Sequence, residues 1–413
     1  MIPKPEILAI AKVTNLLPST VEKDYVLSWV LNAISKNAQL SEWIFKGGTC
    51  LKKCYFETYR FSEDLDFTVP AGAIYDIASI KVALTGIARS LYDETGIEIK
   101  TDTIEVQESF NKNQAKTFEA KFGYIGPLNY NTRSLPRIKF DITNDEFIAE
   151  EPDLRNVYHS YSDAPATPAK LKCYSINEIL AEKTRALYQR EGRARDIYDV
   201  INIGRNFRED VHITRALACL KGKFKFKQLP DPTVELVVNS INFDLLKGNW
   251  IDQLGHQLPV LPPVESFYAD LRQELSWWIE GINAATSLAV ISNAQGENAE
   301  PKVHFPQSLS QRHLGIGRQV DGDGHGSQLG SVMDQIRYAA RNRLCIAFNY
   351  SGVRRVVEPY SLRRPRTGNL LLYVIEKRKG DYLGKGICSF NIEKIGAVEI
   401  LQEVFIPSYL VEL

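Results

Sequence analysis

Apolar and polar positions alternate over much of residues 43–143, and this alternation predicts a mixed sheet. Residues 137–142 show it most clearly, because Ile138, Phe140 and Ile142 fall on one face and polar side chains on the other. A two-residue period is typical of a strand that buries one face. The neighbouring patterns predict helices over 5–40 and 74–95, the second ending at Gly96, and strands over 96–106 and 116–125.

From about residue 170 to 290 the period lengthens to that of amphipathic helices. Ser175 begins a predicted helix over 176–189, and Glu178 stands at the position that completes a capping box. Proline-rich breaks near 230–232 and 259–263 separate further predicted helices. This part of the chain is therefore predicted to be a helical lobe.

The tail from residue 331 is predicted to be a separate small β domain. One helix over 332–343 precedes closely spaced short strands, which are typical of a small β-barrel or a curled sheet. The glycine-rich, polar stretch 293–330 is too polar to bury a core and is predicted to be a flexible linker. Its Gly-Asp-Gly-His-Gly stretch at 322–326 follows no predicted strand, so we assign it to the linker and not to a phosphate loop. The strands of the tail are predicted over 345–350, 353–358, 369–377, 387–391 and 398–401.

The composition is that of an ordinary soluble globular protein. The chain has 413 residues, enough for two or three domains, with 44% hydrophobic and 24% charged residues. Fifty basic residues balance fifty acidic ones, so any polyanion must be held by local patches. No stretch approaches the ~20 apolar residues of a membrane span, and no signal-peptide pattern begins the chain. We therefore expect a cytoplasmic protein without membrane contact.

The six cysteines form no recognisable framework. Cys50 and Cys54 fall four positions apart on a predicted helix, but no Cys-x-x-Cys pair or histidine partner accompanies them. We expect most of the cysteines to be buried, reduced thiols.

Two neighbouring segments carry the candidate chemistry. Phe45-Lys46-Gly47-Gly48-Thr49 is typical of a strand, a tight turn and the start of a helix, whose bare N–H groups can hold a triphosphate. Asp64 and Asp66 lie two positions apart on the next predicted strand, so their side chains point to one face about 7 Å apart. Paired carboxylates favour Mg²⁺, which is usually held by one or two carboxylates together with substrate phosphates. The two segments together predict a nucleotidyltransferase active site.

Asp141 is the candidate third carboxylate of this site. It lies on the polar face of the strand predicted over 137–142. The alternative is a strand-end acid that pairs with Lys139 or Arg137.

These residues resemble the first motif of the AbiEii/AbiGii family of nucleotidyltransferase toxins. The similarity lies in Gly47-Gly48-Thr49-x-Leu51 followed by Arg60-x-Ser62-x-Asp64-Leu65-Asp66-Phe67. Members are bacterial toxins of type IV toxin–antitoxin and abortive-infection systems, and they transfer nucleotides onto RNA, including tRNA. Agreement in three later segments extends the resemblance over about residues 15–225: Glu22-Lys23-Asp24-Tyr25, the strand with Asp141, and Glu178 to Lys183 leading to Arg195-Asp196-Ile197-Tyr198-Asp199.

The resemblance implies an α+β fold and Mg²⁺-dependent transfer of a nucleoside monophosphate from a nucleoside triphosphate to RNA, with tRNA as the expected acceptor. A cognate antitoxin is the expected partner, and defence against phage the expected setting. The implied domains are a nucleotidyltransferase core with a mixed sheet over 1–165, a helical lobe over 166–292, the linker over 293–330 and the small β domain over 331–413.

The resemblance also implies a role for each site residue. Asp64, Asp66 and Asp141 would hold two Mg²⁺ ions, and Asp141 would also accept the proton of the acceptor hydroxyl. Lys183 would neutralise the pyrophosphate leaving group, unless it is only a helix-surface partner of nearby glutamates. The implied nucleotide-binding residues are Gly47, Gly48 and Thr49, which would cradle phosphates, Arg60 and Ser62, which would contact phosphate or orient the loop, and Asp196, which would orient Lys183 or the nucleotide or serve only as a helix cap.

The tail resembles a WYL domain, a small Sm/SH3-like barrel of bacterial regulators and defence proteins. The similar residues are Ala347-Phe348-Asn349-Tyr350, Arg355 to Leu362, Leu371-Leu372-Tyr373 and Phe405-x-Pro407-x-Tyr409, although no tryptophan occupies the strand that names the family. The resemblance implies a nucleotide or nucleic-acid ligand. The candidate basic face comprises Arg354, Arg355, Arg363, Arg364 and Arg366, with a solvated basic edge as the alternative.

Two other functions remain open from the sequence. The same site can act on a small molecule or a protein side chain, or the tail can make the chain a ligand-controlled regulator whose transferase half only binds. RNA would need positive charge near the site, for which Arg190, Arg193 and Arg195 are candidates. Lysines also alternate with phenylalanines over 221–227, a pattern that can suit base stacking but more often belongs to an edge strand with a solvated face.

Overall fold

The computed structural model describes residues 1–57, 59–111, 114–129, 135–281, 331–364 and 369–413. The predicted linker over 293–330, with its glycine-rich stretch, and Arg366 of the predicted basic face lie outside these residues. Among the described helices, none is long and apolar enough to cross a membrane.

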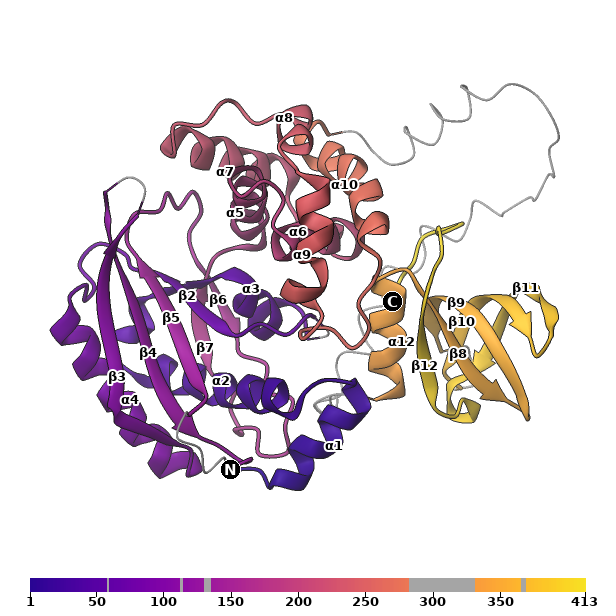
Figure 1. Cartoon of the computed structure of the whole chain (residues 1–413), viewed down its shortest axis with the longest axis horizontal. Helices are drawn as coiled ribbons and strands as arrows, with labels where there is room; N and C mark the ends of the chain where they lie inside the picture. The colour runs from indigo at the N-terminus through magenta and orange to yellow at the C-terminus, as the bar shows by residue number, and fades with distance from the viewer. Residues whose placement is uncertain (58, 112–113, 130–134, 282–330, 365–368) are drawn as a thin grey trace.

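A seven-stranded mixed sheet organises the first part of the chain (Figure 1). Its strand order is β3-β4-β5-β2-β1-β7-β6, in which β2 runs parallel to β5 and β1 parallel to β7. The other neighbours pair antiparallel, so the predicted mixed sheet is confirmed. The strands are β1 Ile44–Lys46, β2 Asp64–Thr68, β3 Glu98–Phe110, β4 Lys116–Ile125, β5 Arg137–Thr143, β6 Asp153–Asn156 and β7 Lys170–Cys173.

Helices from the N-terminal part cover the apolar face of this sheet. Helix α2 packs against α4 and β7, and α4 packs against β3. The end of α4 was predicted correctly, because Gly96 takes the left-handed conformation at φ 75° and its N–H closes the last turn on Tyr92. The helices are α1 Lys4–Thr14, α2 Pro18–Lys36 and α4 Ile77–Thr95, while the short α3 Gly47–Cys50 and a π-helical turn over Leu51–Tyr55 lie between β1 and β2.

The predicted helical lobe is formed by helices that pack on one another beside the sheet (Figure 1). The proline-rich breaks at 230–232 and 259–263 separate α7 from α8 and α9 from α10, as predicted. These helices are α5 Ile176–Gln189, α6 Ala194–Asn206, α7 Ile213–Phe226, α8 Val234–Asn239, α9 Phe243–Leu254 and α10 Val264–Ile279.

Two local predictions in this lobe are wrong for one shared reason. Residues 221–226 belong to helix α7 and not to an edge strand, and Lys223 is buried. Its ammonium nitrogen lies 2.6 Å from a carboxylate oxygen of Glu178. Ser175 does accept the backbone N–H of Glu178, but the Glu178 carboxylate accepts the N–H groups of Ala149 and Glu150 instead of completing the capping box. The buried Glu178–Lys223 pair has thus overridden both local patterns.

The C-terminal part is a helix followed by a five-stranded antiparallel sheet in the order β11-β10-β9-β8-β12. Among the described residues no ladder joins β11 to β12, so the sheet is open; of the two predicted alternatives, a small β-barrel and a curled sheet, the structure has the second. The elements are α12 Val332–Arg341, β8 Leu344–Tyr350, β9 Val353–Arg363, β10 Leu371–Lys379, β11 Tyr382–Asn391 and β12 Val398–Val404.

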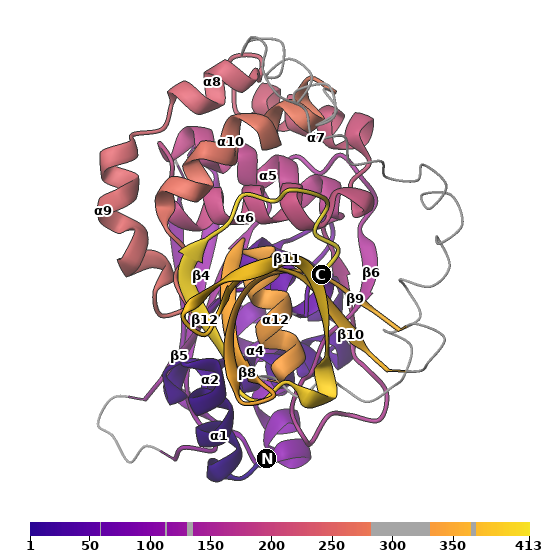
Figure 2. The same ribbon diagram turned by 90° about the vertical axis from the view of Figure 1, so that its right-hand side faces the viewer.

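Helix α12 connects this sheet to the rest of the molecule, as Figures 1 and 2 both show. It packs against β8, β9 and β12 on one side and against α6 on the other. The Tyr338 hydroxyl donates to the Val260 carbonyl at 2.6 Å, and the Tyr198 hydroxyl donates to Asn342 at 3.1 Å. The hydrophobic core therefore continues without a break from the first sheet into the second.

Candidate active site

Strands β2 and β5 bring the three predicted carboxylates to one face of the first sheet. In β5, Ile138, Phe140 and Ile142 are buried and the alternate residues face outward, as the alternation predicted. The parallel β2–β5 ladder places Asp66 directly beside Asp141, with Asp64 two residues before Asp66 on the same face. Asp141 is 75 positions from Asp66 and 77 from Asp64 in the sequence, and the β2–β5 ladder brings it beside them.

The carboxylates oppose one another's ionisation. Burial, followed by the charges of Asp141 and Asp64, raises the pKa of Asp66 to about 6, although Lys46 and Lys183 partly offset the rise. Burial and then the charges of Asp64 and Glu119 raise the pKa of Asp141. Crowded, partly buried oxygen ligands of like charge suit a divalent cation. In the described part of the chain, the carboxylate oxygens of Asp64, Asp66 and Asp141 do not all lie within 4.8 Å of one another.

The glycine turn lies against these carboxylates. Gly47 has φ +80°, and a Cβ at this position would collide with Oδ2 of Asp66. A Cβ on Gly48 would lie 2.5 Å from a guanidinium nitrogen of Arg60 and 3.1 Å from the Ser62 hydroxyl oxygen. Only glycine therefore allows the backbone to approach both segments so closely.

The Thr49 side chain points into the core and holds strand β2 in place. Its side chain is fully buried, and its hydroxyl donates to the Asp64 carbonyl oxygen at 2.5 Å. This bond holds the start of β2 against the first turn of α3. The geometry makes Thr49 a positioning residue for Asp64.

Of the two roles expected for Arg60, its buried position and protein partners favour orientation of the loop over contact with phosphate. It lies before β2 and is 1% exposed, so it does not share the strand face of the aspartates. Its guanidinium makes two 2.7 Å hydrogen bonds with the two carboxylate oxygens of Asp199 and a third, at 2.8 Å, with Gln257. Because all these partners are protein groups, Arg60 anchors the segment before β2 to the core.

Lys183 connects this buried pair to the site. Its ammonium nitrogen lies 2.8 Å from Asp199 and 3.3 Å from Asp196. Burial opposes the charge of Lys183, but Asp199 and Asp196 outweigh it and raise its pKa. Asp199 is also buried, and Arg60 and Lys183 lower its pKa to about 2 against the effect of burial. Asp196 contacts Lys183, which is compatible with the predicted role of orienting it, and its carboxylate also accepts from Arg190 at 3.2 Å.

Two contributors were missed from the sequence. Lys46 pairs with Asp66 across the β1–β2 ladder, and its charge lowers the pKa of that carboxyl. Lys46 comes directly before the glycine pair and lies opposite an acidic strand, and this position could have identified it as a site residue. Asp199 stood in the motif that carried the resemblance, but nothing local identified it as the partner of both Arg60 and Lys183.

Arginines form a positive rim beside Asp64. Arg195 approaches the Asp64 carboxylate at 3.9 Å. Burial and then the charges of Arg195 and Arg190 lower the pKa of Arg193. Arg190 and Arg193 also line a cavity of about 350 Å³ together with Asn249 and Gln253. Mutually repelling cations of this kind favour an anionic ligand.

Paired carboxylates on adjacent strands, faced by a glycine turn and by lysines, define a site of the nucleotidyltransferase class. The family model described as the nucleotidyl transferase AbiEii toxin of the type IV toxin–antitoxin system matches residues 29–278, more than half of the chain. The chain belongs to this family, which confirms the resemblance seen in the sequence. The match ends at residue 278, so the WYL-like character of the tail stays a prediction.

Among solved structures, MenT4, a nucleotidyltransferase toxin from Mycobacterium tuberculosis, is similar to this chain. Its TM-score is 0.45 at 17% sequence identity, and the similarity covers 68% of this chain and 92% of MenT4. A comparison with curated proteins found no match.

Proposed function

We propose that this chain is an Mg²⁺-dependent toxin that transfers a nucleoside monophosphate from a nucleoside triphosphate to RNA, with tRNA as the acceptor. The observation that carries the proposal is the position of Asp66. It lies beside Asp141 across one ladder, opposite Lys46 across another, and in contact range of the Gly47 turn. Carboxylates, a backbone turn open to phosphate and a lysine therefore meet at one point.

In this proposal Asp64, Asp66 and Asp141 hold the metal ions, whose positive charge offsets the burial and the mutual repulsion that raise the pKa of Asp66 and Asp141. When bound, Mg²⁺ supplies charge neutralisation for the triphosphate and its leaving group. Gly47 and Gly48 present backbone N–H groups to the phosphates. Lys183 and Lys46 add fixed positive charge next to Asp66.

The transfer itself forms one bond and breaks one. The acceptor hydroxyl oxygen forms a bond to the α-phosphorus, the bond between the α-phosphorus and the bridging oxygen breaks, and pyrophosphate leaves. Asp141 accepts the hydroxyl proton, a role that its raised pKa supports. Lys183 stabilises the negative charge that develops on pyrophosphate.

The arginine rim supports an RNA acceptor. Arg195 approaches Asp64, and Arg190 and Arg193 line the neighbouring cavity, where these side chains can pair with the phosphates of a polynucleotide. The test is transfer of label to a total tRNA pool from each α-labelled nucleoside triphosphate in turn. We expect labelled tRNA with the wild-type chain, weaker at high salt, and a reduced salt dependence for Arg190→Gln/Arg193→Gln. Label found on protein alone, or on no acceptor, would exclude RNA as the acceptor of the nucleotide.

Family membership implies a cognate antitoxin, and we propose that one opposes this chain in the cytoplasm, where triphosphates and tRNA are found. The Asp64 side chain is 35% exposed and Asp141 is also exposed, so both carboxylates can be reached from solvent. An antitoxin that reduces activity by covering this opening is expected to compete with tRNA in the labelling assay.

Replacing Gly47 tests the close approach of the turn to the carboxylates. Gly47→Ala forces a Cβ into Asp66, so we expect transfer to fall by on the order of 10²-fold, as a shift of about 1 Å at a reacting centre costs. Gly72→Ala is the matched control, since Gly72 has a similar φ of +88° but nothing within 4 Å of an added Cβ. Equal losses in the two variants would show that backbone strain alone, and not the contact with Asp66, matters.

The raised pKa of Asp66 predicts a pH-dependent metal requirement. The stability that neutral Asp66 contributes is fully present below its ordinary pKa of 3.8 and is lost as the pH rises through about 6. Cation binding needs the ionised form, so the Mg²⁺ concentration for half-maximal transfer should rise as the pH falls below about 6. The measurement is a Mg²⁺ titration of the initial rate at fixed ionic strength across this range. A requirement that stays constant down to about pH 5 would contradict the assignment of Asp66 as a ligand.

A further inference from the structure

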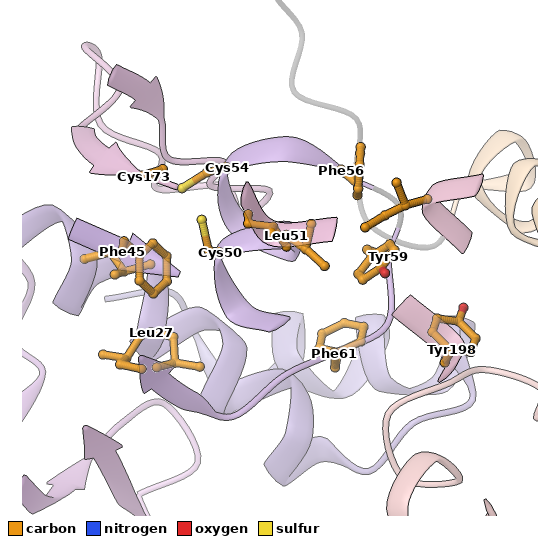
Figure 3. Packing of buried hydrophobic residues seen from close by; sticks show 14 of the residues in the cluster. Leu27, Phe45, Cys50, Leu51, Cys54, Phe56, Tyr59, Phe61, Cys173 and Tyr198 are labelled. Carbon is orange, nitrogen blue, oxygen red and sulfur yellow. The ribbon is translucent and has the colours of Figure 1, made fainter. Parts of the chain in front are cut away.

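Three buried thiols converge about one helical turn beyond the glycine turn. The Sγ atoms of Cys50, Cys54 and Cys173 all lie within 4.8 Å of one another, and the three residues are at most 1% exposed. Figure 3 shows their side chains turned toward a common point between the first helical turn and β7. Cys173 was absent from the sequence-based expectation, because it lies 119 positions beyond Cys54 and reaches the pair through the parallel β1–β7 ladder.

The surroundings favour a thiolate at this point. Burial alone would raise the pKa of Cys54, but hydrogen bonds from the Cys173 and Cys50 thiols, followed by the charge of Arg155, lower it to about 5. Burial keeps the pKa of Cys50 and Cys173 well above the ordinary value. The structure places the three sulfur atoms together, with the Cys173 thiol donating to the Leu171 carbonyl oxygen at 3.5 Å and the Arg155 guanidinium donating to the Cys54 carbonyl oxygen.

We propose that Cys50, Cys54 and Cys173 form a three-sulfur site for a single thiophilic d¹⁰ metal ion of the Zn²⁺ type. Sulfur-only donor sets select such ions over Mg²⁺. Zn–S bonds of about 2.3 Å place thiolate sulfurs about 3.8 Å apart, so the trio has to contract by about 1 Å at most. Binding releases the protons that Cys50 and Cys173 still carry.

The charge of the filled site is compatible with its buried position. Three thiolates and one dication carry a net charge of −1. Arg155 balances it, since its Nε donates to the Cys54 carbonyl oxygen at 3.3 Å and its guanidinium stacks over Tyr55. Lys53 is already paired with Asp24 at 2.7 Å and does not have to contribute.

The ion would have a structural role and would lie outside the transfer site. It ties the end of α3 to β7, and Cys50 is three residues from Gly47. The rival explanations are plain packing of three small side chains and a disulfide between two of them. The experiment separates all three.

The test uses the full chain with Asp64→Ala/Asp66→Ala, so that the carboxylates bind no metal. The protein is stripped with a chelator under reducing conditions and titrated with Co²⁺ and then Zn²⁺. We expect one equivalent of Co²⁺ with a thiolate charge-transfer band that Zn²⁺ abolishes. Cys173→Ser should lose the band, whereas Cys345→Ser, a change at another buried cysteine, should keep it.

A second measurement avoids dependence on the folding of the variants. In the unsubstituted chain, Zn²⁺ should slow alkylation of Cys50, Cys54 and Cys173 by at least tenfold and leave Cys345 unchanged. No stoichiometric binding, or binding that survives Cys173→Ser, overturns the proposal in favour of packing. Loss of two hydrogens from the trio in mild oxidant, together with no Co²⁺ band after reduction, overturns it in favour of a disulfide pair.

Discussion

Asn in place of Asp64 or Asp66 is expected to abolish nucleotide transfer, with a loss of at least about 10³-fold in kcat, because each change removes a metal ligand at the reacting centre. The free energy of unfolding should not fall. Burial, followed by the charges of Asp141 and Asp64, raises the pKa of Asp66 to about 6, so a neutral side chain at this position removes the cost of burying a charge and the repulsion at pH 7. We therefore expect Asp66→Asn to unfold at an equal or higher temperature than the wild type.

The measurement is the initial rate of label transfer together with the thermal unfolding midpoint. Asp102→Asn is the matched control, because Asp102 is an exposed residue of β3 in the same sheet. It should change neither quantity. A double variant that keeps a tenth or more of the wild-type rate would exclude the carboxylates as the metal ligands.

Asn in place of Asp199 is expected to have the largest effect on stability. Asp199 is fully buried and is the shared partner of Arg60 and Lys183. Neutralising it leaves buried Arg60 without its counter-charge and Lys183 with only Asp196, and removing one partner of a buried ion pair costs about 3–5 kcal/mol. The free energy of unfolding, measured in urea, should fall by this amount.

The exposed ion pair between Lys36 and Glu94 supplies the control. Its charged atoms lie 2.8 Å apart, but both side chains are more than a third exposed. Glu94→Gln should therefore cost less than about 1 kcal/mol. Equal losses for Asp199→Asn and Glu94→Gln would contradict the assignment of Asp199 as the centre of a buried network.

Local periodicity predicted the parts of the site that depend on one strand or one turn. The two-residue period of β5 placed Asp141 on the outward face, and the spacing of Asp64 and Asp66 placed them on the same side of β2. The turn at Gly47 could also be predicted from its local sequence, because glycine readily adopts φ +80° and leaves room for the carboxylate packed against it.

Long-range pairing accounts for what the sequence did not predict. Arg60 was expected to contact phosphate or to orient the loop, and its guanidinium is hydrogen-bonded to Asp199, 139 positions away. Alternation of lysine and phenylalanine predicted a strand over 221–227, but Ala216, Leu220 and Phe224 bury a helical face in which Lys223 meets Glu178. In each case a buried charge pair decides the local structure, and neither partner can be recognised from its own neighbours.

Parallel reactions with α-labelled and γ-labelled nucleoside triphosphate, Mg²⁺ and tRNA test the proposed chemistry most directly. Nucleotidyl transfer predicts that the α-label enters tRNA, that the γ-label appears only in pyrophosphate, and that Asp64→Ala/Asp66→Ala produces neither. Entry of the γ-label into tRNA or protein would mean phosphoryl transfer, and release of pyrophosphate without any labelled acceptor would mean hydrolysis. Either result would contradict the transfer of a nucleoside monophosphate to RNA.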